Sequence, residues 1–462
     1  MIVMKFGGTS VADAAAIERL IAIVRAARQA SIQPEAADWR GPVVVVSALG
    51  GATDRLFGLA AEAGAGDVAG AREHLRALEA RHLEVSAVVS DGDLRKDVDA
   101  TIRSEFAQLE RVTGALGVLG DVTPRWLDAI AATGEILSSR IVAAALASRR
   151  LSATWVDARK AIVTTAEHGR GAPLWPETTS AVMKAVDPAL ASRLIPVIGG
   201  YVGATREGVT TTLGRGGSDY SAAIIGACLG ASEIQIWTDV DGMLTADPRL
   251  VPKPRVVSRL SFGEASELAY FGAKVLHPAT IQPAVARNIP VRILNAKHPE
   301  DLGGTLITTD RPPGPGPLTA VASKSGVVVV DVTSTRMLMA HGFLKRIFEV
   351  FEQHRTSVDV VTTSEVSVSV TVDDTARLPA IMKTLSDVAE VTREDGMAIL
   401  CAVGDGLHGD PGFVGELLRA AAPVPIRMLS QAAGRRNVTI VIPESELAAT
   451  LTRVHDRFFG ES

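Results

Sequence analysis

The sequence predicts an α/β protein in which a mostly parallel open sheet is sandwiched by helices and followed by two smaller α+β modules. Three observations support this fold class. Apolar runs of strand length recur over residues 1–310, and most of them end in glycine and polar residues before a helical pattern begins. Residues 311–317 are mainly proline and glycine, which marks a linker. Beyond them the strand and helix patterns follow the order βαββαβ and begin that order a second time.

Length and composition indicate a folded protein of several domains. The chain has 462 residues, of which 47% are hydrophobic and 21% charged, so large cores are expected and long disordered segments are not. The net charge of −5, with mixed signs, argues against a nucleic-acid partner. Cys228 and Cys401 form no CxxC pair, and neither a signal peptide nor a membrane-spanning helix is expected. We therefore expect a cytoplasmic protein with no membrane partner.

The chain begins with a strand, a glycine pair and a helix start. Apolar residues predict a buried strand over residues 1–6, and Gly7 and Gly8 follow it. Ser10, with Asp13 as an acidic partner, predicts the N-cap of a helix over the apolar-periodic residues that come next. Free backbone N–H groups and the positive end of the helix dipole then face one point, which suits a phosphate.

Lys5 lies near the end of this strand, where its ammonium can reach the same phosphate. The alternative is a structural strand-turn-helix corner with a lysine that reaches solvent, and the motif alone does not separate the two. A second apolar run, residues 41–46, ends in Ser47, two glycines and Thr53. This repeats the first layout at the carboxyl end of a strand, where open α/β sheets bind ligands.

Residues 55–118 predict a helical hairpin, broken near residues 90–92, that either covers a site or forms a plain structural layer. The next helix starts at Thr123, and residues 133–135 (Thr-Gly-Glu) interrupt its pattern. Glu135 either faces a ligand ammonium or is an ordinary surface glutamate. Residues 154–159 and 161–165 predict a strand, a polar turn and a second strand, and a further buried strand is expected at residues 195–202.

A second glycine-rich corner precedes a helix at residues 214–219. Arg215 can hold a carboxylate with two N–H groups, while Ser218 and exposed backbone amides bind the other oxygens. Asp219 can orient Lys5 or take part in proton transfer. The spacing fits neither a Walker loop nor the dinucleotide pattern, so a phosphate or carboxylate is bound in a different frame.

A polar loop follows a predicted strand near residues 234–237. Residues 238–249 place carboxylates and hydroxyls around one arginine, which suits nucleotide or Mg²⁺ contacts, although a merely solvated loop is the alternative. A helix, a turn at Gly272 and a second helix ended by Pro278 come next, and Lys274 is placed for a phosphate.

Four blocks, in this order, resemble the signature segments of the aspartate kinases: residues 5–11, 214–219, 237–240 and 271–278. The similarity covers nearly the whole chain, and the type it resembles is monofunctional and lysine-sensitive, with two C-terminal ACT domains. The resemblance implies the amino-acid kinase fold. It also implies transfer of the γ-phosphate of ATP, with Mg²⁺, to the β-carboxylate of L-aspartate. That reaction gives 4-phospho-L-aspartate, the first step of lysine, threonine and methionine biosynthesis.

The resemblance implies roles for single residues. Lys5 and Asp219 would be catalytic, with Asp219 fixing Lys5 rather than acting as a base. ATP would contact Lys5, Gly7, Gly8, Thr238, Asp239, Leu244, Asp247, Arg249, Lys274 and Val275. Aspartate would contact Ser47, Thr53, Glu135, Arg215, Gly216, Gly217 and Ser218, with Glu135 on its α-amino group and Arg215 on its α-carboxylate. Leu244 replaces the usual tyrosine, Asp241 is also unusual, and no metal site built from the protein alone is expected.

The C-terminal part predicts two βαββαβ modules that resemble ACT domains, which bind amino acids at their interfaces. The first would span residues 325–393. The second lacks its sixth strand, and the spare strand at residues 318–324 can supply it. We therefore expect a second module made of residues 318–324 plus 394–462, split around the first, after a kinase domain at residues 1–310.

Two segments of the first module resemble the effector loop of lysine-inhibited aspartate kinases. The expected effector contacts are Met337, Gly342, Phe343, Leu344, Ser357, Val358, Asp359, Thr363, Ser364 and Glu365. Asp359 and Glu365 would meet a cationic side chain, with L-lysine as the expected inhibitor and L-threonine as its main rival. Alternatively, or in addition, these residues build the ACT interface of a homodimer or tetramer.

Two other functions remain open from the sequence. One is another kinase of the same fold that acts on glutamate, an N-acylated amino acid or a nucleotide; the paired modules and the Glu135/Arg215 pair argue against it. The other is a non-catalytic amino-acid sensor with an inactive kinase domain. The presence of Lys5, Asp219 and Lys274 argues against that function.

Overall fold

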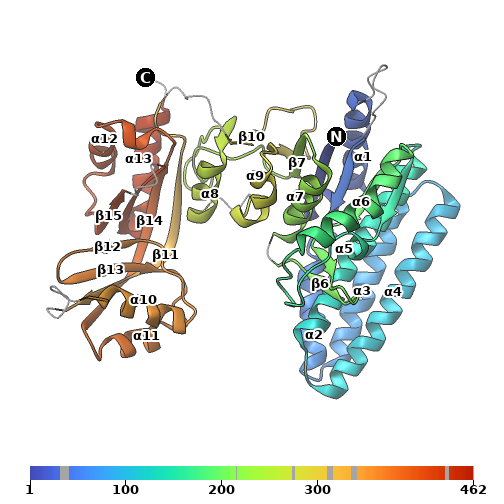
Figure 1. The fold of residues 1–462 in the computed structure, drawn as a ribbon, viewed down its shortest axis with the longest axis horizontal. Helices are drawn as coiled ribbons and strands as arrows, with labels where there is room; N and C mark the ends of the chain where they lie inside the picture. The colour runs from blue at the N-terminus through green and yellow to red at the C-terminus, as the bar shows by residue number, and fades with distance from the viewer. Residues whose placement is uncertain are drawn as a thin grey trace. The chain divides into compact units, whose positions relative to one another are not determined.

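The computed structural model describes residues 1–31, 41–214, 216–272, 276–309, 316–334, 341–431 and 436–460. The chain divides into two compact units (Figure 1). The first unit is Met1–Met243 with Val275–Thr309, and the second is Leu244–Lys274 with Asp310–Ser462. Residues 244–274 therefore group with the C-terminal part, although they precede the linker in the sequence.

The first unit is built on a mostly parallel sheet. Its strands are β1 (Ile2–Phe6), β2 (Val43–Val46), β3 (Ala153–Val156), β4 (Ile195–Gly199), β7 (Glu233–Thr238), β9 (Val291–Asn295) and β10 (Thr305–Thr308). They lie in the order β3-β4-β2-β1-β7-β9-β10, and only the β9–β10 pair is antiparallel. The carboxyl ends of β1, β2 and β4 thus meet at one edge, where such sheets bind ligands.

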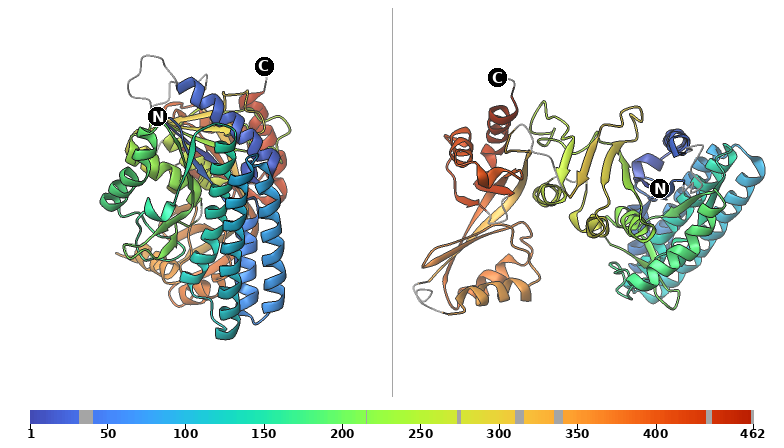
Figure 2. Two further views of the ribbon diagram at one scale, coloured as in Figure 1. Left: turned by 90° about the vertical axis from the view of Figure 1, so that its right-hand side faces the viewer. Right: turned by 45° about the horizontal axis from the view of Figure 1, so that its top comes forward.

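Helices lie on both faces of this sheet (Figure 2). They are α1 (Ala14–Ser31), α2 (Ala52–Gly64), α3 (Val68–Val85), α4 (Gly92–Leu119), α5 (Pro124–Ser148), α6 (Trp175–Ala191), α7 (Gly217–Leu229) and α9 (Gln282–Ala286). Short 3-10 helices are η1 (Gly8–Val11), η2 (Ser86–Val88), η3 (Ala158–Lys160) and η4 (Pro278–Ile281). β5 (Val202–Ala204) and β6 (Thr210–Thr212) form a small antiparallel pair.

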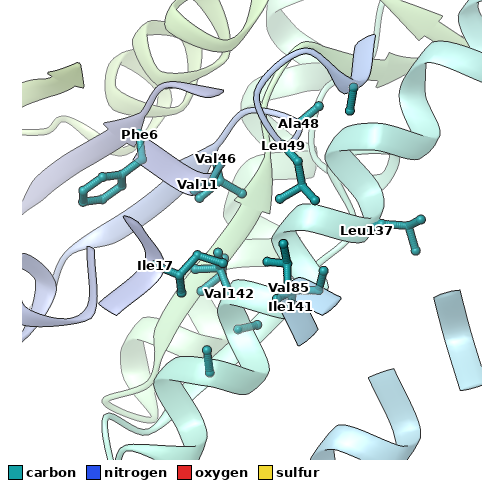
Figure 3. Packing of buried hydrophobic residues seen from close by; sticks show 14 of the residues in the cluster. Phe6, Val11, Ile17, Val46, Ala48, Leu49, Val85, Leu137, Ile141 and Val142 are labelled. Carbon is teal, nitrogen blue, oxygen red and sulfur yellow. The ribbon is translucent and has the colours of Figure 1, made fainter. Parts of the chain in front are cut away.

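Strand β1 shows how the apolar pattern positions the site. Side chains alternate across a strand, so Met4 and Phe6 point to one face of the sheet and Lys5 points to the other. Met4 and Phe6 are fully buried in a core that also takes in residues of α1 to α5. Figure 3 shows part of that core, with Phe6, Val46 and Ile141 among the labelled residues. The large apolar area buried there anchors the strand end that carries Lys5.

The helical layer differs from the predicted hairpin over residues 55–118. Three helices, α2, α3 and α4, pack beside α5 in place of two (Figures 1 and 2). Gly66, with φ of 91°, turns the chain after α2, and the carboxylate of Asp67 accepts the Gly70 N–H at 2.9 Å to cap α3. The predicted break near residues 90–92 is confirmed, because Asp91 caps the start of α4.

The interruption of the apolar pattern at residues 133–135 does not break the helix, because α5 continues through it. Gly134 is explained by packing: a Cβ there would lie only 2.8 Å from the Cβ of Ala48. Among the described residues, α5 is also the one helix long and apolar enough to cross a membrane. Within the apolar window concerned, 89% of the residues are buried inside the protein, and core helices commonly pass this test.

Two strand predictions also need correction. Residues 161–165 make only isolated bridges, from Val163 to Ala204 and from Thr164 to Pro173. The predicted strand at residues 195–202 is divided into β4 and β5, because Tyr201 takes a left-handed conformation with φ of 64°. Both departures lie beside the edge of the sheet described above, where the chain turns rather than extends.

The second unit contains an antiparallel sheet in the order β12-β13-β11-β14-β16-β15. The strands of this sheet are β11 (Ala320–Thr333), β12 (Val361–Thr363), β13 (Ser367–Val372), β14 (Glu390–Val403), β15 (Met428–Gln431) and β16 (Asn437–Pro443). The second unit also contains the short strand β8 (Arg259–Ser261), which lies outside this sheet. Its helices are α8 (Phe262–Phe271), α10 (Phe343–Gln353), α11 (Leu378–Leu385), α12 (Phe413–Ala421) and α13 (Leu447–Phe459), with 3-10 turns η6 (Leu407–Gly409) and η7 (Glu444–Glu446).

Strands β11 and β14 each run through two hydrophobic cores. One core includes Leu318 and Val321 and is covered by α12 and α13. The other includes Val330 and is covered by α10 and α11 (Figure 1). Each pair of strands expected from the sequence, 318–324 with 326–333 and 388–392 with 397–403, is therefore one continuous strand. Gly326 and Gly396, both with φ of 71°, lie between the two halves.

Candidate active site

A pocket of about 560 Å³ lies in the first unit, beside the carboxyl ends of β1 and β2 and the N-terminus of α7. Its lining is Lys5, Gly8, Ser47, Ala48, Leu49, Gly50, Gly51, Thr53, Asp54, Phe57, Glu135, Gly169, Tyr201, Gly214, Gly216, Gly217, Ser218 and Asp219. The expected acceptor residues with described positions, from Ser47 to Ser218, all belong to this lining. Sequence stretches separated by up to about two hundred residues thus meet at one place.

Among the described residues that line the pocket, the cationic group is the ammonium of Lys5. It lies 2.7 Å from Oδ1 of Asp219, and the two side chains are only 11% and 13% exposed. The alternation of β1 points Lys5 away from the core, and Asp219 is in the first turn of α7, which packs against the same strand. The ion pair holds the Lys5 ammonium in a fixed position in the pocket lining.

The predicted helix cap at Ser10 was wrong. The chain after β1 makes the 3-10 turn η1, and the hydroxyl of Ser10 donates to the carbonyl of Trp237 at 3.4 Å. Asp13 caps α1 in its place, because its carboxylate accepts the Ala16 N–H at 2.7 Å. The first turn beside the pocket is therefore the 3-10 turn, with Gly7 and Gly8 at its start.

The glycines after β1 and β2 allow two turns to touch. A Cβ on Gly8 would lie 3.3 Å from the carbonyl oxygen of Ala48, and one on Gly50 would lie 3.2 Å from the carbonyl oxygen of Gly8. The N–H of Gly7 donates to Trp237 at 3.0 Å. Side chains are thus excluded from this wall, and backbone groups face the pocket.

Glu135 is a buried carboxyl with few partners to stabilise its charged form. Its residue is 3% exposed, and its Oε2 has no hydrogen-bond partner within the described part of the chain. Burial raises the pKa of Glu135 to about 8, and a hydrogen bond with the backbone of Ala48 offsets this only in part. A buried carboxyl in a pocket wall with an unused oxygen is suited to bind an ammonium ligand.

The N-terminus of α7 forms the anion-binding side. Gly216, at the N-cap, has φ of 70°, which a residue with a side chain rarely adopts. Ser218 follows in the first turn of α7. It lies close to the end of β4, since a Cβ added to Gly200 would be 2.7 Å from the Cβ of Ser218. The N–H groups of Gly217 and Asp219 already donate to the carbonyls of Gly214 and Gly216, both at 3.0 Å. The helix dipole and the Ser218 side chain therefore favour a carboxylate or phosphate here.

Some predicted ligands lie elsewhere or outside the described residues. Arg215, Lys274, Val275 and Met337 belong to the segments that the structure does not describe. Thr238 ends β7 and Asp239 follows it, with the Thr238 hydroxyl donating to Asp239 at 3.3 Å, and neither residue lines the pocket. Asp241, the other unusual position, accepts the Asn295 side-chain amide at 2.6 Å.

The remaining nucleotide candidates belong to the second unit. Asp247 and Arg249 form a bidentate pair, with Nε of Arg249 at 3.0 and 3.1 Å from the two carboxylate oxygens. Leu244 makes a backbone bridge with Val256. Arg249, which the sequence predicts to contact the nucleotide, is thus paired with a carboxylate of its own loop.

The expected effector residues occupy one end of the second unit. Gly342, with φ of 79°, precedes α10; Phe343 is buried and Leu344 is exposed. Ser357, Thr363, Ser364 and Glu365 are exposed, and Val358 is half-buried. Asp359 differs, since its side chain is 2% exposed and pairs with Lys324 at 2.8 Å. A cation of this chain therefore already occupies the carboxylate expected to meet an effector cation.

Several residues that line the pocket did not emerge from the sequence, among them Tyr201 and Gly169. Tyr201 lines the pocket in its left-handed conformation, and Gly169 does so from a loop more than thirty residues before it. Asp128 holds that loop by accepting the Gly169 N–H at 3.0 Å. The Gly-Arg-Gly sequence at residues 169–171 is a turn signal that could have indicated this loop. The strand predicted just before it, at residues 161–165, makes only isolated bridges.

Comparison with known proteins agrees with this geometry. Residues 1–295 match the amino acid kinase family, and residues 400–458 match an ACT domain. The chain is 33% identical to lysine-sensitive aspartokinase 3 of Escherichia coli (strain K12), over 99% of both proteins. It is 34% identical to chloroplastic aspartokinase 1 of Arabidopsis thaliana, over 99% of this chain and 80% of that protein.

Solved structures give the same result. The E. coli aspartokinase III complex with aspartate and ADP, in the R-state, has a TM-score of 0.83 at 33% identity, over 99% of this chain and 100% of that one. The complex of the same enzyme with lysine and aspartate, in the T-state, has a TM-score of 0.81 at 32% identity, over 99% of both chains. The fold class and the family resemblance predicted from the sequence are confirmed, and the chain belongs to the aspartokinases of the amino acid kinase family.

Proposed function

We propose that the protein transfers the γ-phosphate of ATP to the β-carboxylate of L-aspartate. One observation carries the proposal. A single pocket has an anion-binding side, made by Lys5 and the start of α7, and also the carboxyl of Glu135, whose Oε2 has no hydrogen-bond partner among the described residues. An α-amino acid presents the complementary charges. The E. coli relative whose structure contains aspartate and ADP supports the same assignment.

The acceptor lies between these two sides. Glu135 binds the α-ammonium, and this contact lowers the pKa that burial has raised. The start of α7, with Gly216, Gly217 and Ser218, binds the α-carboxylate, and Arg215 adds a bidentate contact by its position in the chain. Ser47 and Thr53, on the opposite wall, direct the β-carboxylate toward Lys5.

The chemistry needs positioning and charge neutralisation. An oxygen of the β-carboxylate attacks the γ-phosphorus, the bond from that phosphorus to the bridging oxygen breaks, and ADP leaves with the electron pair. The nucleophile is already an anion, so no general base is required. Lys5 stabilises the charge of a loose transition state, and Asp219 keeps its ammonium aimed.

The nucleotide is held from several segments. We propose contacts from Lys5, Gly7, Gly8, Thr238, Asp239, Leu244, Asp247, Arg249, Lys274 and Val275. Within the described residues there is no cluster of three His, Cys, Asp or Glu side chains that could hold a metal by itself. Mg²⁺ commonly binds through one or two carboxylates plus phosphate oxygens, and Asp219 is a carboxylate of this pocket that fits such a role. When bound, the ion neutralises charge on the phosphates.

Feedback inhibition is proposed for the second unit. L-Lysine is the proposed effector, supported by the lysine complex of the E. coli relative, and L-threonine is the rival. The contacts would come from the exposed residues around Ser357 and Thr363 and from the start of α10. The proposed domains are 1–310 for the kinase, 325–393 for the first ACT domain and 318–324 plus 394–462 for the second. A cytoplasmic homodimer or tetramer joined through these domains completes the proposal.

The test is ADP release with Mg²⁺-ATP and L-aspartate, run with L-glutamate in parallel and with or without L-lysine or L-threonine. We expect turnover with aspartate and little with glutamate, and suppression by lysine. Turnover with aspartate that neither amino acid suppresses would retain the kinase and refute the effector. Folded protein that binds ATP but gives no turnover with aspartate would refute the proposed reaction.

A further inference from the structure

A second buried carboxylate lies on the same helix as Glu135, seven residues earlier. Asp128 is 2% exposed. Its Oδ1 accepts the Thr212 hydroxyl at 2.5 Å and the Gly169 N–H at 3.0 Å. Its Oδ2 lies 2.7 Å from Nδ1 of His168 and 3.1 Å from the same Gly169 nitrogen. Residues seven apart share a helix face, so α5 presents one saturated carboxylate and one undercompensated carboxyl on the same side.

All three donors to Asp128 come from the segments that build one wall of the pocket. His168 and Gly169 belong to the loop after the bridge at Thr164, and Thr212 ends β6. The same loop is tied to β6 by a hydrogen bond from the Gly171 N–H to the Thr212 carbonyl at 2.8 Å. Asp128 is thus the point on α5 to which the loop and the strand are both attached.

This attachment reaches the pocket lining directly. Gly169 lines the pocket and has φ of 81°, a conformation that the loop must be held in. A Cβ on Gly214, which also lines the pocket, would lie 3.1 Å from the Gly169 carbonyl oxygen. A shift of the loop by a fraction of an ångström therefore moves the residues that lead into the start of α7.

We propose that Asp128 is a positioning residue for the amino-acid acceptor. By binding Gly169 it fixes the loop that forms the pocket wall facing Glu135. The distance between that wall and Glu135 is then the one that the acceptor needs. The inference rests on the proposed function, since it assumes that this pocket takes the acceptor. Asp128 touches neither the acceptor nor the nucleotide. It acts through Gly169, and its loss changes acceptor binding more than the chemical step.

A structural role alone would give a different result. A buried, fully hydrogen-bonded carboxylate is commonly no more stabilising than an apolar replacement, but removing it leaves its donors unpaired. Such a loss destabilises the whole unit and lowers every kinetic parameter together. The positioning role predicts that the KM for the acceptor rises selectively.

The experiment compares Asp128→Ala and Asp128→Asn in the full-length protein. Asparagine can accept from Thr212 and Gly169 with its oxygen and donate to His168 with its amide, so it retains the geometry without the charge. We expect Asp128→Ala to raise the KM for L-aspartate by about 10- to 100-fold, with kcat and the KM for ATP changed less than ~3-fold. Asp128→Asn should have a KM for L-aspartate close to that of the wild type.

The matched control is Asp99→Asn. Asp99 accepts the hydroxyl of Ser86 at 2.5 Å on α4 and does not line the pocket, so its loss should leave both KM values unchanged. An unchanged acceptor KM in Asp128→Ala, or equal losses in kcat and both KM values, would refute the positioning role. If Asp128→Ala does not fold, His168→Ala removes one donor and must still raise the acceptor KM. Wild-type protein without aspartate-dependent turnover would instead refute the proposed function.

Discussion

The phenol of Tyr270 donates a 2.8 Å hydrogen bond to the carboxylate of Asp359. Tyr270 lies near the end of α8, which comes before the linker, whereas Asp359 belongs to the segment that resembles an effector loop. Lys324 joins the pair, at 2.8 Å from Asp359 and 2.7 Å from Asp373. The carboxylate expected to recognise an effector is therefore also an attachment point for α8.

Tyr270→Phe tests this attachment, because it removes the donor and keeps the ring. We expect turnover without effector to be unchanged and maximal inhibition by L-lysine to fall. The reason is that the variant loses the contact from Asp359 to α8, which contributes to the coupling free energy between effector and acceptor sites, ordinarily ~1–3 kcal/mol. The measurement is an inhibition curve beside a direct lysine titration by calorimetry. Glu267→Gln is the control: it keeps an acceptor for the Asn437 amide on the same helix. Equal inhibition in Tyr270→Phe and wild type would contradict the prediction.

Lys5→Ala should lower kcat by ~100- to 1,000-fold, because the residue acts on charge that develops in the transition state. ATP binding should largely survive, since backbone groups and other segments also hold the nucleotide. Stopped assays for kcat and a fluorescent nucleotide titration for binding check the two statements. Lys184→Ala, on the surface of α6, serves as the control. A near-normal kcat in Lys5→Ala would remove the residue from the mechanism.

Glu135→Gln should stabilise the protein at alkaline pH. The folded-state pKa of about 8 lies above the ordinary 4.5, so from pH 4.5 upward the unfolded chain releases this proton and the folded protein retains it. The free energy of unfolding therefore falls between those two pH values and is level above the upper one. At ~1.4 kcal/mol per pKa unit, the variant gains a few kcal/mol over wild type there. Urea unfolding near pH 4.5 and above pH 8 measures the difference.

The same substitution should weaken acceptor binding, because glutamine cannot pair with an ammonium. We expect the KM for L-aspartate to rise by at least ~10-fold, the loss of a charge-assisted hydrogen bond in a buried site. The two effects have opposite signs, so a variant that is both less stable and weaker in binding would indicate mere damage to the fold.

Gly134→Ala and Gly114→Ala form a matched pair of helix glycines. An added Cβ at Gly134 would lie 2.8 Å from Ala48, which lines the pocket, whereas at Gly114 it would meet nothing within 4 Å. Gly114→Ala should stabilise by ~0.5–1 kcal/mol through helix propensity. Gly134→Ala should destabilise by ~1–3 kcal/mol through overpacking and raise the acceptor KM. Thermal unfolding and steady-state kinetics test both, and equal shifts in the two variants would contradict the packing explanation.

The parts predictable from sequence were those with a strong local pattern. Buried strands, glycine corners and charged residues close to glycines identified much of the pocket, including Lys5 on β1, Glu135 within α5 and Asp219 in the first turn of α7. The fold class followed from the same periodicities. These signals are local because each comes from one short stretch of sequence, either a strand with the turn after it or a glycine beside a charged residue.

The parts that failed depend on contacts between distant segments. Ser10 looks like a cap, but Trp237 takes its hydroxyl, and Asp13 caps the helix. Gly134 interrupts an apolar helical pattern without a local reason, but close packing against Ala48 requires a glycine there. Asp359 looks like a free ligand, but Lys324 pairs with it. In each case a partner more than thirty residues away decides the outcome, and no periodicity records it.

The continuous strands β11 and β14 make the regulatory half of the chain a single cooperative structure. Ala320 pairs with Val403 at one end of the ladder and Thr333 pairs with Glu390 at the other, so the same two strands serve both hydrophobic cores. Unravelling either core would strip hydrogen-bond partners from the strands that support the other. A ligand that stiffens one core therefore protects the amides of both from exchange with solvent, and neither half can be excised as an independently folding fragment.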